Sequence, residues 1–446
     1  MSSSVVTVDP VTDVLARNAA GEHIGVTSVC SAHPLVLLAA VVHARETGEL
    51  LLVEATSNQV DQTGGYTGLR PADFHDLVLH LADQHGLPRE RVVLGGDHLG
   101  PNRWKGLPPA EAMGHADVLV AAYVAAGFTK IHLDCSFPCA GDPVPLTDDL
   151  VAARAARLVC VAEDTAATHG RTGTLRYVIG TEVPTPGGAH ETLHDLVPTT
   201  TEAASATLQT HREAFAAREL SHVWPRVAAV VVQPAVEFDH TRVIDFDPSA
   251  TTGLSRVLDA EPTMVFEAHS TDYQTTAALS ALVAQHWAVL KVGPGLTFAL
   301  REALFALAAI DDELVPAADR SHLLQVLEDR MLAEPAQWDG YYPGTMDEQR
   351  VLRRFSYSDR ARYYWPDPTV DAAVRTLLGN LDARTVPLPL LSQHLPAQYV
   401  RIRAGELSTT AEDLVVDHVR DVLRSYSRAC HPPTTRPTTT LEEATR

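Results

Sequence analysis

Short apolar runs recur eight times between residues 24 and 290, and more polar, helix-like segments separate them. The runs are rich in Val, Leu and Ile on both faces, which is typical of strands buried on both sides of a sheet. They predict strands at 24–30, 50–53, 91–94, 130–133, 177–180, 227–232, 264–266 and 288–290. Strands that alternate with helices at this spacing indicate repeated βα units and a parallel sheet.

The intervening segments predict the connecting helices, one of which opens with Pro-Ala-Asp, a good first-turn composition. Helices are expected at 34–45, 71–85, 109–126, 148–168, 202–218, 247–258, 275–285 and 297–309. Eight units in succession favour an α/β fold of the (β/α)8 TIM barrel type, which takes about 250 residues. The alternative is an open doubly wound sheet, but no Gly-x-Gly-x-x-Gly follows the first run, so dinucleotide binding lacks its usual support.

Beyond residue 310 the alternation stops, and helix-like segments punctuated by Pro366 and Pro387 take over. We therefore expect a barrel at 13–310 and a helical extension at 311–430 that packs on it. The segments 1–12 and 431–446 are expected to be flexible termini, since the second is rich in Thr and Pro and poor in core-forming residues.

The amino-acid composition limits the kinds of binding partner that we expect and indicates the cellular compartment. The 446 residues carry 56 acidic and 35 basic side chains, a net charge of −21, which disfavours nucleic acid and anionic membranes as partners. The five cysteines are an odd number without framework spacing, which favours a reducing cytoplasm. The first ten residues lack the pattern of a signal peptide, and no run approaches the ~20 apolar residues of a membrane span.

Residues that can do chemistry follow most of the apolar runs. Because a barrel gathers the C-terminal ends of its strands around one opening, where active sites lie, these side chains should converge on one pocket. In chain order they are Ser31, His33, Glu54, Asp97, His98, Asp134, Ser136, Glu182, Gln233, Glu267, His269, Ser270, Asp272, Lys291 and Gly293.

Histidines and carboxylates from separate runs point to a metal. His98 and His269, with Glu182 or Asp134, would supply the three or four N and O ligands of an open catalytic site for a divalent ion such as Zn²⁺. His240 is a further candidate, although it lies several residues beyond its run. His132 alternates with Asp134 along one strand, and we interpret it as a buried residue that fills the barrel.

The remaining candidates suggest acid–base and substrate-binding roles. Asp97 could act as a base or orient the substrate, and the buried carboxylate of Asp134 needs a partner. Lys291 could neutralise a phosphate or protonate a developing alkoxide; a Schiff base, which needs no metal, is the alternative. Ser270 and Gly293 suit phosphate binding through backbone N–H groups, because loops after the last two strands often do this.

Long strings of this chain resemble the GatZ/KbaZ family. The resemblance runs from about Val14 to Cys430 and is carried by strings such as Gly95–Asn102, Glu237–His240 and Glu267–Gln274. It implies a class II aldolase-like barrel, a place in tagatose or galactitol carbohydrate metabolism, and an oligomer. It also implies a partner, a catalytic class II tagatose-bisphosphate aldolase subunit that this chain would stabilise.

More distant catalytic class II aldolases have an Asp-His after one strand, an Asp-x-Ser after the next and a later metal-binding His. Asp97–His98, Asp134 with Ser136, and His269 are similar to those positions. The glycine-rich phosphate loop of those aldolases is replaced here by residues 270–274. Their metal-binding His after the sixth strand has no clear counterpart unless His240 serves.

Two functions remain open at this point. One is a non-catalytic stabilising subunit of class II D-tagatose-1,6-bisphosphate aldolase. The other is a metal-dependent ketose or ketose phosphate 4-epimerase, in which Asp97 takes the proton of the C4 hydroxyl during a retro-aldol step and the reverse step restores the sugar as its epimer.

Overall fold

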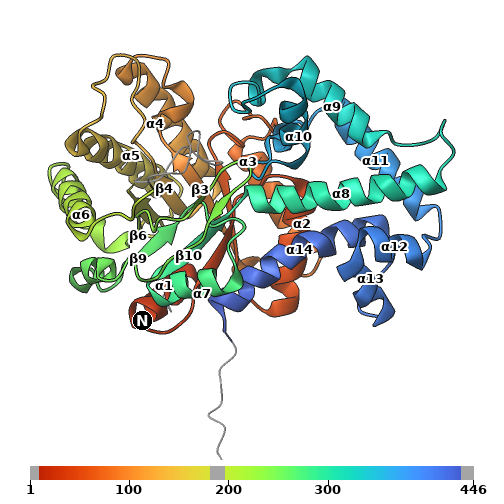
Figure 1. The fold of residues 1–446 in the computed structure, drawn as a ribbon. Coiled ribbons are helices and arrows are strands. Elements are labelled where there is room, and N and C mark those ends of the chain that lie inside the picture. The colour runs from red at the N-terminus through yellow and green to blue at the C-terminus, as the bar shows by residue number, and fades with distance from the viewer. Residues whose placement is uncertain (1–9, 181–195, 433–446) are drawn as a thin grey trace, which may run out of the picture.

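The computed structural model describes residues 10–180 and 196–432, and within them eight parallel strands close into a barrel. Around the barrel their order is β1, β10, β9, β6, β5, β4, β3, β2. Figure 1 shows part of the barrel, with β3, β4, β6, β9 and β10 labelled. The strands are β1 (Val26–Val29), β2 (Leu51–Thr56), β3 (Val92–Leu99), β4 (Lys130–Leu133), β5 (Arg176–Ile179), β6 (Val227–Val231), β9 (Val265–Ala268) and β10 (Trp287–Val292). Each overlaps one predicted run, so the expected TIM barrel is confirmed.

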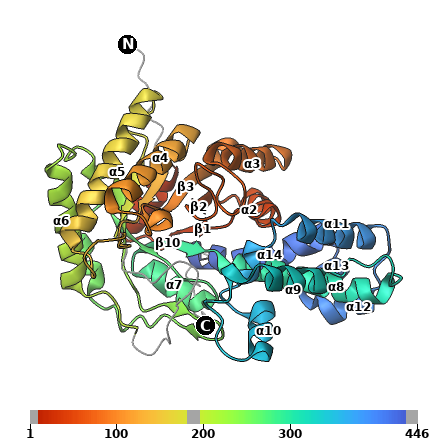
Figure 2. The same cartoon turned by 90° about the horizontal axis from the view of Figure 1, so that it is seen from above.

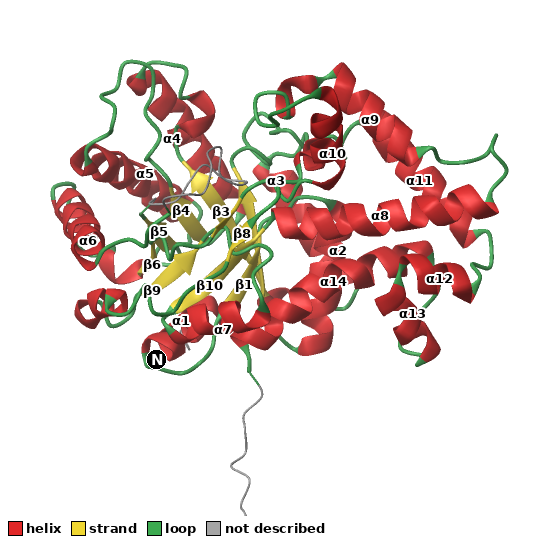
Figure 3. Cartoon of the chain, viewed as in Figure 1, coloured by secondary structure: helices red, strands yellow, loops and turns green. Residues whose placement is uncertain are grey.

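Helices surround the barrel in the expected alternation (Figure 3). They are α2 (Pro34–Thr47), α3 (Pro71–Gln84), α4 (Pro109–Ala126), α5 (Asp148–Thr168), α6 (Thr201–Ala216), α7 (Thr276–Ala284) and α8 (Pro294–Leu314). Prolines start α2, α3, α4 and α8, where the missing N–H costs nothing. The hydroxyls of Thr147, Thr200 and Thr275 cap the other three by accepting a backbone N–H.

The prediction of a helix at 247–258 is wrong. Asp247 accepts the backbone N–H and the hydroxyl of Ser249, which favours a turn, and Gly253 adopts a φ of 110°. A 3-10 helix at Leu254–Ala260 follows. A hairpin that the pattern did not reveal, β7 (Glu237–Phe238) with β8 (Val243–Ile244), lies between β6 and this turn.

The chain enters the barrel through α1 (Pro10–Ala19), which begins earlier than the predicted end of the flexible arm. Val11 and Leu15 are buried against Val26, Leu52 and Val265 from three strands. Because these strand residues belong to the N-terminal halves of their strands, α1 covers the end of the barrel remote from the expected site.

The extension gathers around the outer part of α8, which runs away from the barrel (Figure 2). It contains α9 (Leu323–Ala333), α10 (Met346–Phe355), α11 (Pro368–Asp382), α12 (Leu388–His394), α13 (Pro396–Arg403) and α14 (Ala411–Cys430). Short 3-10 helices occur at Arg89–Arg91, Asn102–Trp104, Trp224–Arg226, Pro335–Gln337 and Arg360–Tyr363.

The last helix, α14, returns to the barrel. It contacts α2, α7, α8 and β1, and the N–H of Gly25 donates to the carbonyl of Cys430 at 3.1 Å. One cluster of buried apolar side chains runs from the barrel helices into the extension and includes Val36, Leu300, Leu377 and Leu423. Over residues 10–180 and 196–432, no helix combines the length and apolarity that crossing a membrane requires.

Candidate metal centre

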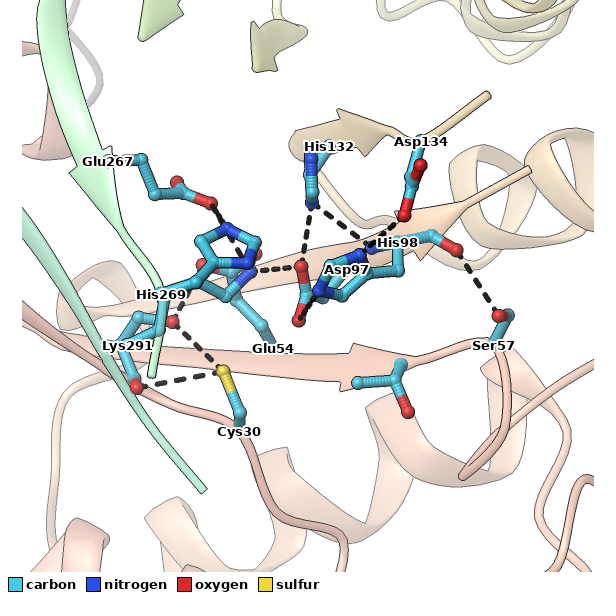
Figure 4. A network of polar contacts seen from close by, with 12 residues as sticks. Cys30, Glu54, Ser57, Asp97, His98, His132, Asp134, Glu267, His269 and Lys291 are labelled. Atoms are coloured by element: carbon cyan, nitrogen blue, oxygen red, sulfur yellow. Dashed lines mark hydrogen bonds and ion pairs between the residues drawn. The ribbon is translucent and has the colours of Figure 1, made fainter. Parts of the chain in front are cut away.

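Four buried side chains present metal-ligand atoms to one another at the C-terminal end of the barrel strands. Asp97, His98, His132 and His269 each offer one such atom, and these atoms all lie within 4.8 Å of one another. The ring of His98 lies 4.8 Å from those of both His132 and His269, and the last two are 5.1 Å apart, centroid to centroid. Figure 4 shows the three imidazoles grouped around Asp97.

The backbone is shaped to bring these rings together. His98 and Ser270, which follows His269, adopt positive φ angles of 49° and 53°. A side chain in this left-handed region costs about 1 kcal/mol or more, so the surrounding structure must enforce it. A Cβ on Gly100 would lie 1.8 Å from the carbonyl oxygen of Asp134, which explains why glycine closes this turn.

Asp134 orients His98. Its Oδ2 lies 2.7 Å from Nδ1 of His98, and its Oδ1 accepts the hydroxyl of Ser136 at 2.7 Å. With Nδ1–H donated to Asp134, Nε2 of His98 keeps its lone pair for a metal. Although burial opposes both charges, Asp97 and Asp134 raise the pKa of His98, and the hydrogen bond from His98 lowers the pKa of Asp134.

His132 joins this group instead of only filling the barrel. Its Nδ1 lies 2.8 Å from Oδ1 of Asp97, and its Nε2 lies 3.3 Å from the carbonyl oxygen of Gly180. The alternation of His132 with Asp134 was the available signal, but it does not say whether an inward-facing imidazole packs or binds.

A buried charged layer lies beneath the four ligands. Nζ of Lys130 contacts Glu54 at 2.7 Å and Glu267 at 2.6 Å, while Lys291 contacts Glu267 at 3.2 Å and forms a close ion pair with Asp97. A Cβ on Gly95 would lie 2.7 Å from Cγ of Glu54, so glycine makes room for this carboxylate.

This layer fixes the charge state of Lys291. Although burial opposes the ammonium, Asp97, Glu267 and Glu54 hold the pKa of Lys291 well above its ordinary value. His98, and then Lys291, hold the pKa of Asp97 well below the usual range, and Lys130, and then Lys291, do the same for Glu267, again against burial. A permanently protonated amine is a poor nucleophile, so the Schiff-base alternative loses support.

The four side chains supply a donor set for a metal ion. Burial, and then Lys291, lowers the pKa of His269 to about 3, so its imidazole is neutral, as metal binding requires. Three imidazoles and one carboxylate form a donor set suited to a first-row divalent ion.

A cavity opens over this group. Asp97, His98, His269 and Lys291 line it, with Ser270, Asp272 and Gly293 from the same loops. The extension contributes Arg362 and Tyr363. The other lining residues are Cys30, Thr56, Asn58, Gln59, Tyr66, Phe238, Pro294 and Thr297.

Several predicted substrate contacts have other partners. Oδ1 of Asp272 accepts the backbone N–H groups of Gly293 at 2.9 Å and Gly295 at 2.7 Å, so the donors expected to bind phosphate serve an internal carboxylate. Burial raises the pKa of Asp272 to about 6, although these N–H groups oppose the rise. Ser31 and His33 line a neighbouring pocket instead.

Two further predicted residues have partners away from the metal group. Oε1 of Gln233 accepts the N–H of Val236 at 3.0 Å. The ring nitrogens of His240 contact the hydroxyl of Ser358 at 3.1 Å and the carbonyl of Tyr341 at 2.8 Å, so this histidine joins the barrel to the extension. Glu182 lies outside the described residues.

Comparisons with known proteins identify relatives of this chain. A family model described as "D-tagatose-1,6-bisphosphate aldolase subunit GatZ/KbaZ-like" matches residues 11–431. A crystal structure of a probable tagatose 6-phosphate kinase from Sinorhizobium meliloti 1021 is 49% identical, with a TM-score of 0.84 over 91% of this chain and 100% of that one.

Two more distant structures are a fructuronate-tagaturonate epimerase from Cohnella laeviribosi and a fructose-bisphosphate aldolase from Campylobacter jejuni. The first is 13% identical, with a TM-score of 0.45 over 92% of this chain and 82% of that one. The second is 12% identical, with a TM-score of 0.44 over 84% and 92%. At these values neither likeness bears on the chemistry of the site.

Proposed function

The chain belongs to the D-tagatose-1,6-bisphosphate aldolase subunit GatZ/KbaZ-like family, and from this premise we propose that it is a metal-dependent ketose or ketose phosphate 4-epimerase of tagatose metabolism. The observation that carries the proposal is the convergence of Asp97, His98, His132 and His269 within 4.8 Å. A purely stabilising role gives no reason for four buried ligand atoms to meet beside an open cavity.

His98, His132 and His269 would hold the ion, which we propose is Zn²⁺, and Asp97 would lie beside it. When bound, a divalent ion supplies Lewis-acid stabilisation of negative charge on the oxygens of the ketose. The ordered Asp134–His98 and Glu267–His269 contacts, 2.7 Å and 3.0 Å long, hold two of the three rings in place.

Asp97 is the base of the proposed reaction. Its low pKa keeps it ionised, in the form that accepts the proton of the C4 hydroxyl as the C3–C4 bond breaks. The ammonium of Lys291 beside it stabilises the negative charge that develops on the three-carbon fragment. Rotation of the aldehyde fragment and reversal of the step give the C4 epimer, whereas release of the fragments gives an aldolase.

The second candidate function is the stabilising subunit of a class II D-tagatose-1,6-bisphosphate aldolase. The family description favours it, because it names a subunit. In that case the chain would assemble with a catalytic aldolase subunit, and its own cavity would not turn over substrate.

Metal analysis of the chain purified alone separates the two candidates. We expect about one equivalent of divalent metal, and conversion of fructose 6-phosphate or tagatose 6-phosphate to its epimer followed by NMR. His269→Ala should lower metal affinity by about 100-fold or more and abolish turnover, because it removes one ligand. His222→Ala, at an exposed loop histidine, is the matched control.

A metal-free, inert chain that restores activity to a separately purified aldolase subunit would support the second candidate. Unchanged metal content in His269→Ala would contradict the ligand assignment.

A further inference from the structure

A guanidinium from the extension lines the same cavity as the metal group. We propose that Arg362, with the hydroxyl of Tyr363, is the anion-binding subsite of this cavity, and that the substrate is a ketose bearing a terminal phosphate or carboxylate. This inference rests on the proposed function and deepens it, because it names the class of ketose.

Arg362 has no close acidic partner among the described residues, although the carboxylates of Asp359 and Asp272 attract its guanidinium from a longer distance. Its Nη1 donates to the carbonyls of Ser358 and, at 3.2 Å, Asp359, and its Nη2 donates to the hydroxyl of Tyr363 at 3.1 Å. No carboxylate of residues 10–180 or 196–432 forms an ion pair with it. A guanidinium has five N–H donors, so donors remain for an anion, and a partly buried cation without a close ion pair favours one.

Other arginines of this region form close ion pairs or stack on an aromatic ring. Arg301 pairs with Asp359 at 2.7 Å, and Arg353 pairs with Glu328 at 2.5 Å. Arg360 stacks on the ring of Tyr341 and does not line the cavity. Among the cavity's lining residues, Arg362 and Lys291 are the cations, and Lys291 is neutralised by Asp97 and Glu267.

The usual phosphate position of this fold is already filled. In TIM barrels a phosphate often binds the backbone N–H groups that follow the last strands. Here the N–H groups of Gly293 and Gly295 donate to Oδ1 of Asp272. An anion at these N–H groups would have to displace the Asp272 carboxylate, so an anionic substrate needs another donor, and Arg362 lines the same cavity.

The segment that carries Arg362 is held firmly to the barrel. The carboxylate of Asp359, at a φ of 43°, accepts Nε of Arg301 at 2.7 Å and the hydroxyl of Thr297 at 2.6 Å, both from α8. The hydroxyl of Tyr273 donates to the carbonyl of Tyr357 at 2.6 Å. Such anchoring positions the guanidinium before substrate arrives, which lowers the entropic cost of binding.

Tyr363 completes the subsite. Its hydroxyl accepts from Arg362, so its own O–H is left to donate, and the ring packs edge-on against Tyr66 at 4.8 Å between centroids. Tyr66 belongs to the loop after β2, so the barrel and the extension close this part of the wall together.

Calorimetric titration of the metal-loaded protein tests the assignment. The ligands are fructose 6-phosphate, fructose and fructuronate, and the variants are Arg362→Gln and Arg362→Lys. We expect Arg362→Gln to weaken binding of the anionic ligand by about 10–100-fold, and Arg362→Lys by less, with binding of fructose changed less than about threefold. Preference for the phosphate or the carboxylate ligand identifies the anion.

Arg375→Gln is the matched control, because it removes the same charge from an exposed position of α11 in the same extension. Equal weakening of all three ligands in Arg362→Gln, or equal losses in Arg375→Gln, would overturn the assignment. Metal content of Arg362→Gln is measured in parallel and should equal that of the unmodified chain. Failure to bind metal in both proteins contradicts the proposed function, whereas normal metal content without selective loss contradicts only this subsite.

Discussion

At the scale of single residues, the orientation of His98 depends on one carboxylate. Asp134→Asn keeps an oxygen near Nδ1 of His98 but removes the charge that makes the imidazole a stronger ligand. We expect metal affinity to fall by about 10–100-fold, less than in a variant that removes a ligand. Competition with a chromogenic chelator measures this. A fall as large as that of His269→Ala would mean that Asp134 itself binds the metal.

Glu237 gives a prediction about pH. It is fully buried, Oε2 has no partner among the described residues, and burial raises its pKa to about 7, although the N–H of Phe238 and the hydroxyl of Ser270 oppose the rise. The folded state therefore keeps a proton that the unfolded chain, with an ordinary pKa near 4.5, has already released. Between these values the free energy of unfolding falls as pH rises.

Glu237→Gln removes this dependence because an amide does not ionise. Relative to its value at pH 4.5, the free energy of unfolding of the unmodified chain should fall at pH 8 by about 2–4 kcal/mol more than that of the variant. Urea titrations at both pH values measure the difference. Parallel pH profiles for the two proteins would show that Glu237 ionises normally in the fold.

The position of a site residue in the fold decides whether the sequence could predict it. Asp97, His98 and His269 end strands, and strand ends converge in any barrel, so their meeting could be anticipated. His132 could not be assigned, because inward-facing residues fill the barrel or bind with the same sequence pattern. Arg362 lies 93 residues after His269, in a part of the chain whose path over the barrel no periodicity encodes.

At the scale of elements, three strands share one ionic layer. Lys130 of β4 pairs with Glu54 of β2 and Glu267 of β9. Lys130→Met would remove the ammonium that pairs with two buried carboxylates. We therefore expect the free energy of unfolding to fall by about 3–5 kcal/mol. Adding Glu54→Gln should recover part of that loss, since it removes one of the two negative charges left without their cation.

Denaturant titrations of the single and double variants measure this coupling. Arg375→Gln, which breaks an exposed pair, should change stability by less than about 1 kcal/mol. Additive losses from Lys130→Met and Glu54→Gln would contradict the layer's role as a coupled unit.

Elements with strong periodicity could be predicted, and short or locally determined ones could not. The strand at Lys130–Leu133 and the helix at Asp148–Thr168 have the bounds that their patterns predict. The hairpin of β7 and β8 has two residues in each strand, too few for an alternation to show. The predicted helix at 247–258 gave way to side-chain-to-backbone bonds of Asp247, which compete with helix formation.

At the scale of the whole molecule, the last helix, α14, packs the extension against the barrel. The hydroxyl of Tyr426 donates to the carbonyl of Thr271 at 2.8 Å, and the hydroxyl of Thr271 donates to the carbonyl of Lys291 at 2.6 Å. The last helix therefore contacts the loop that follows His269. The helical pattern of this segment is visible in the sequence, but its position between α2 and α7 depends on contacts made across almost 400 residues.

If barrel and extension share one core, they unfold together. Calorimetry should show one transition, and Leu423→Ala in α14, where the side chain is 3% exposed, should move the whole transition to lower temperature at a cost of about 2–5 kcal/mol. Val400→Ala in α13, where the side chain is 63% exposed, should cost less than about 0.5 kcal/mol. Because α14 also supports the loop after β9, Leu423→Ala should release metal in the same transition. A separate low-temperature transition that moves alone, with metal retained, would show that the extension unfolds independently of the site.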